Sequence, residues 1–166
     1  MANAEDLVDA GLDWLRQHYD RFRFFTERDV VWSVQTRLLD LVVELDLNFR
    51  VLNDFGILPG RRRSLSVDLA VVSPAGPVDY ALEFKYEPSH RRADIEPKKL
   101  PVVSWGEDGV AGDIVRVRKF VAEGRTKAAR SYFIDEGGYF RHREPHAGSC
   151  WVSWGGDCWV LISQAP

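Results

Sequence analysis

Two acidic residues and one lysine, spaced over a pair of predicted strands, could together bind a metal ion and act on a charged substrate. Asp68 lies in the apolar segment 65–73, and Glu83 and Lys85 lie in a second apolar segment, 78–86. Because strand side chains alternate between two faces, Glu83 and Lys85 share one face of their strand. The sequence therefore predicts a β-hairpin that presents two carboxylates and an ammonium group together.

The loop between the two strands predicts which residues face each other. Residues 74–77 have the composition of a turn, so Ser73 is expected to pair with Val78. The same register places Asp68 directly across from Glu83. Like charges in that position destabilise a sheet, so the two carboxylates need a compensating cation.

A divalent cation bound by Asp68 and Glu83 supplies that compensation. Oxygen ligands suit Mg²⁺ or Mn²⁺, and the carbonyl of Phe84 is a further candidate ligand. Such an ion lowers the pKa of a bound water and polarises a phosphate, as phosphodiester hydrolysis requires. Lys85, expected across from Ser66 on the same face, is a candidate to orient the nucleophile or to stabilise developing negative charge.

Two other interpretations of these residues stay open. In the first, the three residues form a solvent-facing charge cluster in which Lys85 neutralises one acid. The second is a metal-free α/β binding protein, which a wide separation of Asp68 from Glu83 and Lys85 would support. Apolar neighbours favour central strands over solvent-facing ones: Val67, Leu69, Val71, Val72, Leu82 and Phe84.

The elements that must position the hairpin follow from the spacing of apolar residues. Helices are expected over 5–19, 27–45 and 112–123, with Thr26 as the N-cap of the second. Strands are expected over 48–52, 65–73, 78–86 and 129–134, followed by a hairpin of 149–154 and 157–163. The segment 87–110 is expected to be a long loop. The predicted fold is α/β (α+β), one domain with a mixed central sheet flanked by helices.

Turn residues and helix caps set the boundaries of these elements. Asn53–Gly56, Pro59–Gly60 and Gly155–Gly156 are predicted turns. Asp113 is interpreted as the N-cap of the third helix rather than as a ligand.

The two cysteines are interpreted as free thiols. Pairing Trp154 with Asp157 in the final hairpin places Cys150 across from Leu161, which separates it from Cys158 and disfavours a disulfide. Their spacing matches no zinc motif.

Composition favours an ordinary intracellular globular protein. The chain has 166 residues, of which 45% are hydrophobic and 28% charged. No apolar run approaches the roughly 20 residues that span a bilayer, so no membrane association is expected. The acidic N-terminus does not resemble a signal peptide, and the expected location is cytoplasmic.

The net charge of −3 is unusual for a protein that binds nucleic acid. The acidic excess lies in residues 1–60, and the rest of the chain contains basic clusters that are either solvated or in contact with phosphates: Arg61–Arg63, Arg91–Arg92, Lys98–Lys99, Arg116–Lys119 and Arg125–Arg130.

The order Asp68, a short turn, then Glu83-Phe84-Lys85 resembles the core motif of the PD-(D/E)XK, or restriction-endonuclease-like, nuclease superfamily. The resemblance covers residues 26–135 and implies an αβββαβ core. It implies that Asp68 and Glu83 bind the metal and that Lys85 is catalytic. Glu27, early in the helix before the hairpin, matches an additional acidic residue of several branches. Val67 stands where the motif's name expects proline.

The resemblance leads us to expect a Mg²⁺- or Mn²⁺-dependent nuclease that hydrolyses nucleic acid, DNA foremost. Because the chain is small and acidic, we expect weak specificity, a homodimer, or a protein partner that brings it to DNA. The alternative is a catalytically inactive nuclease-like module that acts through protein–protein contacts in a defence or repair assembly.

Several residues are weaker candidates for contacts with the substrate. Gln35 lies on the same helix face as Glu27, and Arg116 and Lys119 could contact phosphates, although a surface role fits all three. Four tryptophans could stack on unpaired bases or pack in the core: Trp105, Trp151, Trp154 and Trp159.

Overall fold

A six-stranded mixed sheet with helices on both faces forms this α+β protein. The computed structural model describes residues 3–57, 66–74, 76–96 and 100–165. The helices are α1 (Ala4–His18), α2 (Glu27–Glu44) and α3 (Val110–Ala122), with a short 3₁₀ turn at Tyr19–Arg21. The strands are β1 (Arg50–Gly56), β2 (Ser66–Val72), β3 (Val78–Glu87), β4 (Thr126–Asp135), β5 (Ser149–Gly155) and β6 (Cys158–Gln164).

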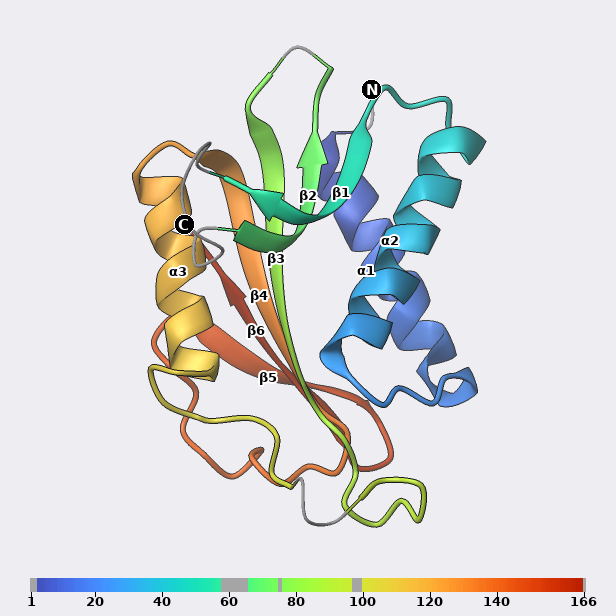
Figure 1. Ribbon diagram of the computed structural model, residues 1–166, viewed down its shortest axis with the longest axis vertical. Coiled ribbons are helices and arrows are strands. Elements are labelled where there is room, and N and C mark those ends of the chain that lie inside the picture. Colours follow the sequence, from blue (N-terminus) through green and yellow to red (C-terminus); the bar gives the residue numbers. More distant parts are fainter. Residues whose placement is uncertain (1–2, 58–65, 75, 97–99, 166) are drawn as a thin grey trace.

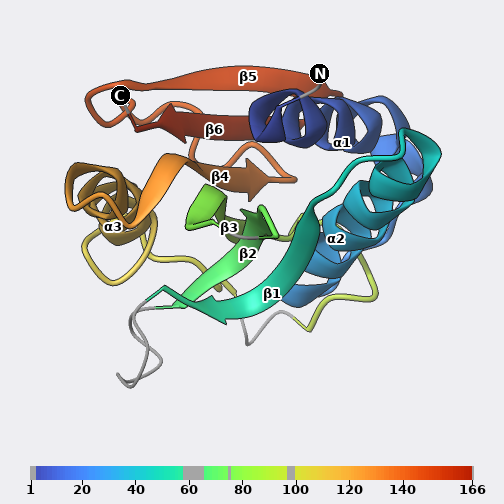
Figure 2. The same cartoon turned by 90° about the horizontal axis from the view of Figure 1, so that it is seen from above.

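The sheet order is β1-β2-β3-β4-β6-β5, and among these described strands only β3 and β4 run parallel. Helix α3 covers one face, while α1 and α2 cover the other (Figures 1 and 2). The parallel pair requires a crossover, and α3 lies in that connection. Within the described ranges, none of the helices is both long enough and apolar enough to cross a membrane.

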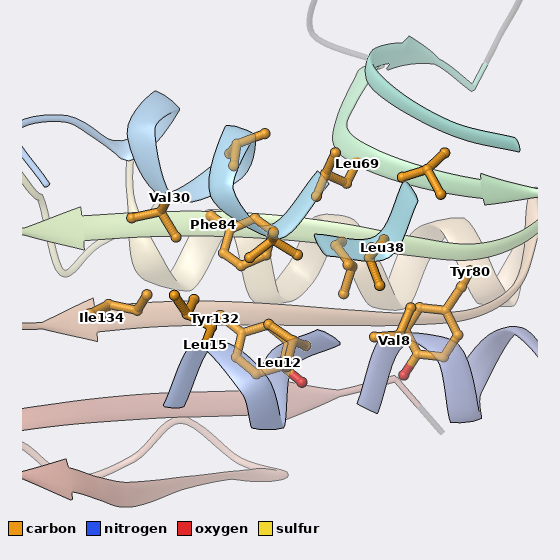
Figure 3. Close-up of a cluster of buried hydrophobic side chains, with 14 of the residues drawn as sticks. Val8, Leu12, Leu15, Val30, Leu38, Leu69, Tyr80, Phe84, Tyr132 and Ile134 are labelled. Carbon is orange, nitrogen blue, oxygen red and sulfur yellow. The ribbon is translucent and has the colours of Figure 1, made fainter. Parts of the chain in front are cut away.

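The main core lies between the sheet and the helix pair α1–α2. The apolar stripe predicted for α2 is buried, and it faces aromatic residues of β3 and β4 (Figure 3). At the crossing of the two helices, a Cβ on Gly11 would lie 2.5 Å from Leu38 Cδ2, so glycine permits the close approach. The residues of the cluster include Val8, Leu12, Leu15, Val30, Val34, Leu38, Leu69, Tyr80, Phe84, Tyr132 and Ile134.

A second core lies under α3. Small residues line the sheet there, which lets the helix pack closely against β3 and β4. The cluster includes Ala70, Val72, Ala81, Val117, Phe120 and Ala129. The face of the sheet beneath α3 is therefore the face on which Glu83 and Lys85 were expected.

The helix predictions are confirmed within two residues, with one correction. Thr26 is the N-cap of α2, where its backbone N–H donates to the Asp29 carboxylate at 2.8 Å. Helix α3 begins at Val110 with Gly109 as its N-cap, so the assignment of Asp113 as an N-cap is wrong. Asp113 lies within the first turn, and its side chain is free to point at the sheet.

Strand β1 differs from the expectation. It was predicted over 48–52, with a turn at Asn53–Gly56, but it runs from Arg50 to Gly56. Asp54 adopts a left-handed conformation, with φ of 46°, between two residues that pair with β2. Aspartate tolerates this conformation, so turn-forming residues are accommodated here inside a strand. Val67, opposite this region, packs under α3, although simple alternation along β2 would place it on the face of Leu69. The turn predicted at Pro59–Gly60 lies outside the described residues.

The final hairpin forms, but its predicted register is wrong by one residue. Cys150 pairs with Ile162 instead of Leu161, and Ser153 pairs with Trp159. An irregularity between Ser153 and Gly155 adds the extra residue, and two consecutive glycines with positive φ make it possible. The two cysteines are free thiols, as expected.

The expected long loop between β3 and α3 is anchored to the end of β3. The fully buried carboxylate of Glu87 accepts hydrogen bonds from the backbone N–H groups of Val102 and Val103, at 3.0 and 2.9 Å. Because these bonds satisfy a buried charge, they hold the described end of the loop against the sheet.

The interdigitation of α2 with the sheet makes a direct prediction about stability. Leu38→Ala should lower the free energy of unfolding by about 2–5 kcal/mol, because Leu38 is fully buried and its removal leaves a cavity. The neighbouring variant Leu39→Ala is the matched control. Leu39 is 43% exposed, and its truncation should change stability by about 0.5 kcal/mol or less. Urea denaturation of both variants measures the difference, and equal losses would contradict this packing.

Candidate active site

The candidate site lies where β2 and β3 separate. The predicted register is confirmed for the pairs Leu69↔Leu82, Ala70↔Ala81 and Val71↔Tyr80.

Beyond Leu69 the ladder stops, and the Asp68 carboxylate accepts the backbone N–H of Phe84 at 2.7 Å. The Asp68 side chain thus replaces a backbone carbonyl of β2 as the hydrogen-bond acceptor for the Phe84 N–H. The predicted pairings of Asp68 with Glu83 and of Ser66 with Lys85 are not part of this ladder. The Lys85 side chain instead contacts acids at the N-termini of α2 and α3.

The other end of the hairpin contains a bulge that the loop length did not predict. Val72 pairs with Val78, so the expected pairing of Ser73 with Val78 is wrong. The Ser73 N–H donates instead to the Asp79 carboxylate at 2.7 Å, and Lys127 lies 2.6 Å from the same side chain. The extra residue lies beyond Val71, so the pairs from Leu69 to Val71 keep the predicted register.

Glu83 is buried and bound by an arginine of α3. Its side chain is 1% exposed, and its two carboxylate oxygens accept hydrogen bonds from Arg116 at 2.9 and 2.8 Å. Arg116 Nη2 also donates to Asp113 at 2.7 Å. This bidentate contact is the strongest geometry available to a carboxylate and a guanidinium.

Lys85 joins the ends of two helices. Its Nζ lies 3.2 Å from Glu27 Oε2 at the start of α2 and 2.9 Å from Asp113 Oδ2 in the first turn of α3. It also donates to the carbonyl of Phe84 at 3.1 Å. Both acids lie near helix N-termini, where the helix dipole stabilises negative charge.

The cluster holds more acids than bases, four carboxylates against two cations. The acids are Glu27, Asp68, Glu83 and Asp113, and the cations are Lys85 and Arg116. Such a surplus of buried acid favours protonation or the binding of a further cation.

The pKa values reflect this surplus. Burial and the neighbouring Asp68 raise the pKa of Glu83 well above its usual range, although Arg116 opposes them. Burial also raises the pKa of Asp68, against the lowering effect of the Phe84 N–H.

At the edge of the cluster, burial raises the pKa of Glu27 to about 7, even though Lys85 lowers it. Burial by itself lowers the pKa of Lys85, but Glu27, Asp113 and Asp68 together raise it, so Lys85 is charged at neutral pH.

A small pocket opens onto the cluster. Glu27 and Asp68 lie in its wall, and its cavity volume is about 100 Å³. The lining is completed by Arg28, Val31, Trp32, Asn53 and Asp54. A hydrated ion or part of a phosphate can therefore approach the two carboxylates from solvent.

The donor set suits a hard divalent cation, because it consists of carboxylate oxygens with a surplus of negative charge. Among the residues that the structure describes, however, no group of three or more His, Cys, Asp or Glu side chains is arranged to hold a metal ion. Arg116 occupies both oxygens of Glu83, and Lys85 contacts the carbonyl of Phe84. The types of ligand atom therefore suit a divalent cation, but Arg116 and Lys85 contact two of the predicted ligands, Glu83 and the carbonyl of Phe84.

The predicted site residues divide into two groups. Asp68, Glu83 and Lys85 come together with Glu27 and Arg116, which rules out the wide separation that would have favoured an unrelated binding protein. Gln35 donates to the carbonyl of Val51 at 3.4 Å and does not line the pocket. Lys119 is exposed and lies 3.7 Å from Glu123. Arg61–Arg63 and Lys98–Lys99 lie outside the described residues.

Three residues near the site were not recognised in the sequence. Asp113 was interpreted as a cap, and only the position of α3 shows that it contacts Lys85 and Arg116. Arg28 and Trp32 line the pocket. The sequence could have indicated Trp32, because it lies off the apolar stripe of its helix, and a residue in that position is expected to be exposed.

Comparisons with known proteins do not assign the chain to a family. No family model, curated protein or solved structure matches it. The geometry of the cluster is therefore the basis for any functional conclusion, and the resemblance to the PD-(D/E)XK superfamily stays a prediction.

The pairing of Glu83 with Arg116 can be tested through stability. Arg116→Met should lower the free energy of unfolding at pH 8 by about 3–5 kcal/mol, because it leaves a buried carboxylate without its cation. The double variant Glu83→Gln/Arg116→Met should recover most of this loss.

The loss should also depend on pH. The folded-state pKa of Glu83 lies above its unfolded value, so its contribution to stability is fully present below the unfolded pKa and is lost as pH rises through the folded pKa. Arg116→Met should therefore be less destabilising at pH 5 than at pH 8. Urea denaturation at both pH values measures this, and equal losses in the single and double variants would refute the pairing.

Proposed function

We propose that this protein is a divalent-metal-dependent nuclease. The observation that carries the proposal is the convergence of Asp68, Glu83 and Lys85 with Glu27 where β2 and β3 separate. Hydrolysis of a phosphodiester requires an activated water, charge stabilisation at phosphorus and access from solvent. The cluster supplies groups for the first two, and the pocket beside Glu27 and Asp68 supplies the third.

The order of elements supports a restriction-endonuclease-like core. Over Glu27–Asp135 the chain runs α2-β1-β2-β3-α3-β4, which is the αβββαβ order that the motif implies. The motif residues lie on the second and third strands of this order. The acid of the preceding helix also reaches the site, as Lys85 lies 3.2 Å from Glu27.

Asp68 and Glu83 are the residues we assign to the metal. A bound Mg²⁺ or Mn²⁺ supplies Lewis acidity toward the phosphate and lowers the pKa of water. Glu83 can contribute only when Arg116 releases at least one of its oxygens. The surplus of carboxylates favours that exchange, because a second positive charge relieves their mutual repulsion.

Two side chains act directly in this proposal. Glu27, with a pKa of about 7, accepts the proton of the attacking water at neutral pH. Lys85, which stays charged, stabilises the negative charge that develops on the phosphorane-like transition state. Asp113 holds Lys85 from the opposite side and so keeps the ammonium group in place.

One observation favours a second candidate, a catalytically inactive nuclease-like module. Arg116 satisfies Glu83 with two hydrogen bonds, which gives one predicted ligand a permanent protein partner. Such a module would act through protein contacts, without a metal. The response of the protein to divalent cations separates the two candidates.

The proposal predicts metal-dependent cleavage that requires Lys85. With Mn²⁺, the protein should degrade single-stranded, duplex or branched DNA, and Lys85→Ala and Asp68→Asn should each lower the rate by about 100-fold or more. Asp157→Asn, an exposed carboxylate that pairs with Arg91, is the matched control and should retain activity. Equal product from the wild type and Lys85→Ala would refute the mechanism.

Binding of the metal should be detectable without catalysis. Mg²⁺ or Mn²⁺ should raise the Tm of the wild type, because a ligand that binds only the folded state stabilises it, and Asp68→Asn should remove the rise. Differential scanning calorimetry measures the effect. An absence of any rise would favour the inactive module.

A further inference from the structure

A solvent-exposed tryptophan lies at the entrance to the acidic cluster. Trp32 is 54% exposed, although an indole of this size usually has most of its surface buried. It lies off the stripe by which α2 packs on the sheet, so the core does not require it. Packing within the chain therefore does not explain why position 32 holds a tryptophan.

Trp32 is continuous with the candidate site. It lines the same pocket as Glu27 and Asp68, and Arg28 lines that pocket as well. Residues four apart on a helix are neighbours on its surface, so the guanidinium and the indole project from the same side of α2. A flat aromatic surface and a positive charge thus lie side by side next to the carboxylates proposed to act on the phosphate.

We propose that Trp32 and Arg28 bind the nucleotide next to the cleaved bond, the indole by stacking on its base and the guanidinium by contacting a phosphate. This inference rests on the proposed nuclease function and specifies its substrate class. In a duplex both faces of each internal base are covered by neighbouring base pairs, so only an unpaired base offers a free face to an aromatic ring. The substrate is therefore single-stranded nucleic acid or a junction with unpaired nucleotides.

An alternative occupant of Trp32 is another protein. On its other side, Trp32 borders a shallow groove of about 340 Å³ that also contains Trp14 and Phe22. Two observations favour a nucleotide. Arg28 supplies the positive charge that a phosphate requires, and the pocket that it lines joins the exposed indole to Asp68.

Fluorescence anisotropy with a labelled 12-nucleotide single strand tests the proposal. Measurements in EDTA and in Ca²⁺ separate binding from cleavage. Trp32→Ala should weaken binding by about 5- to 150-fold, the usual range for loss of one stacked base, while Trp32→Phe should retain most of the affinity. Arg28→Gln should also weaken binding and reduce its dependence on salt by about one phosphate contact.

The matched control is Leu39→Ala, another exposed apolar residue of α2 that does not line the pocket. Its affinity for the single strand should equal that of the wild type. A blunt hairpin duplex should bind with the same affinity to the wild type and to Trp32→Ala. Unchanged single-strand binding by Trp32→Ala, or an equal loss on the duplex, would overturn the proposal.

Two further outcomes separate this inference from the function on which it rests. Single-strand binding that depends on Trp32 without any cleavage in Mn²⁺ would support the nucleotide site and refute the nuclease. Cleavage by Trp32→Ala equal to that of the wild type, with unchanged affinity, would overturn the nucleotide site alone. Self-association that Trp32→Ala abolishes, with unchanged affinity, would likewise overturn it and assign the indole to a protein contact.

Discussion

The separation of β2 from β3 is the constraint on which the site depends. At Asp68 the carboxylate takes the place of a strand carbonyl and accepts the N–H of Phe84. The amide stays satisfied while the two strands diverge, so the break in the ladder leaves no buried polar group unpaired. Beyond this point Lys85 contacts acids of both helical layers, Glu27 of α2 and Asp113 of α3, while Glu83 contacts Arg116 of α3. Without this exchange, α2 and α3 would contact opposite faces of a continuous sheet and could not share ligands.

Electrostatic balance is the second requirement. Glu83 is almost fully buried, and its charge is tolerated because Arg116 binds both oxygens and Asp113 orients the guanidinium. Lys85 likewise forms ion pairs with Glu27 and Asp113 and so offsets their negative charge. The network still contains more acid than base, and burial raises the pKa of Asp68, Glu83 and Glu27. The same surplus that costs stability gives the cluster its affinity for a proton or a further cation.

The helices connect this chemistry to the surface. The first residue of α2, Glu27, reaches Lys85, and the next residue, Arg28, lies beside the pocket with Trp32, which follows one turn later. The buried side of the same helix packs on the sheet and fixes its orientation (Figure 3). One helix therefore sets both the position of a catalytic candidate and the surface that a substrate would meet first. This coupling explains why the interdigitation around Leu38 matters for the site as well as for stability.

The sequence by itself determined which elements form and that Glu83 lies on the face of β3 that α3 covers. Periodicity and turn composition located the helices, the strands and the pairing around Ala70↔Ala81, because these depend on local preferences and on side-chain alternation. It did not determine the bulge at Asp79, where Lys127 of a distant strand binds the carboxylate. Nor did it determine the left-handed residue Asp54 or the register of the final hairpin, since local composition allows these conformations without requiring them. Only the tertiary structure brought Arg116 and Asp113 to Glu83 and Lys85, since the crossover places α3 against the parallel strands. Ion pairs between separate elements produce no periodic pattern in the sequence, so their partners become known only when the packing of the elements is known.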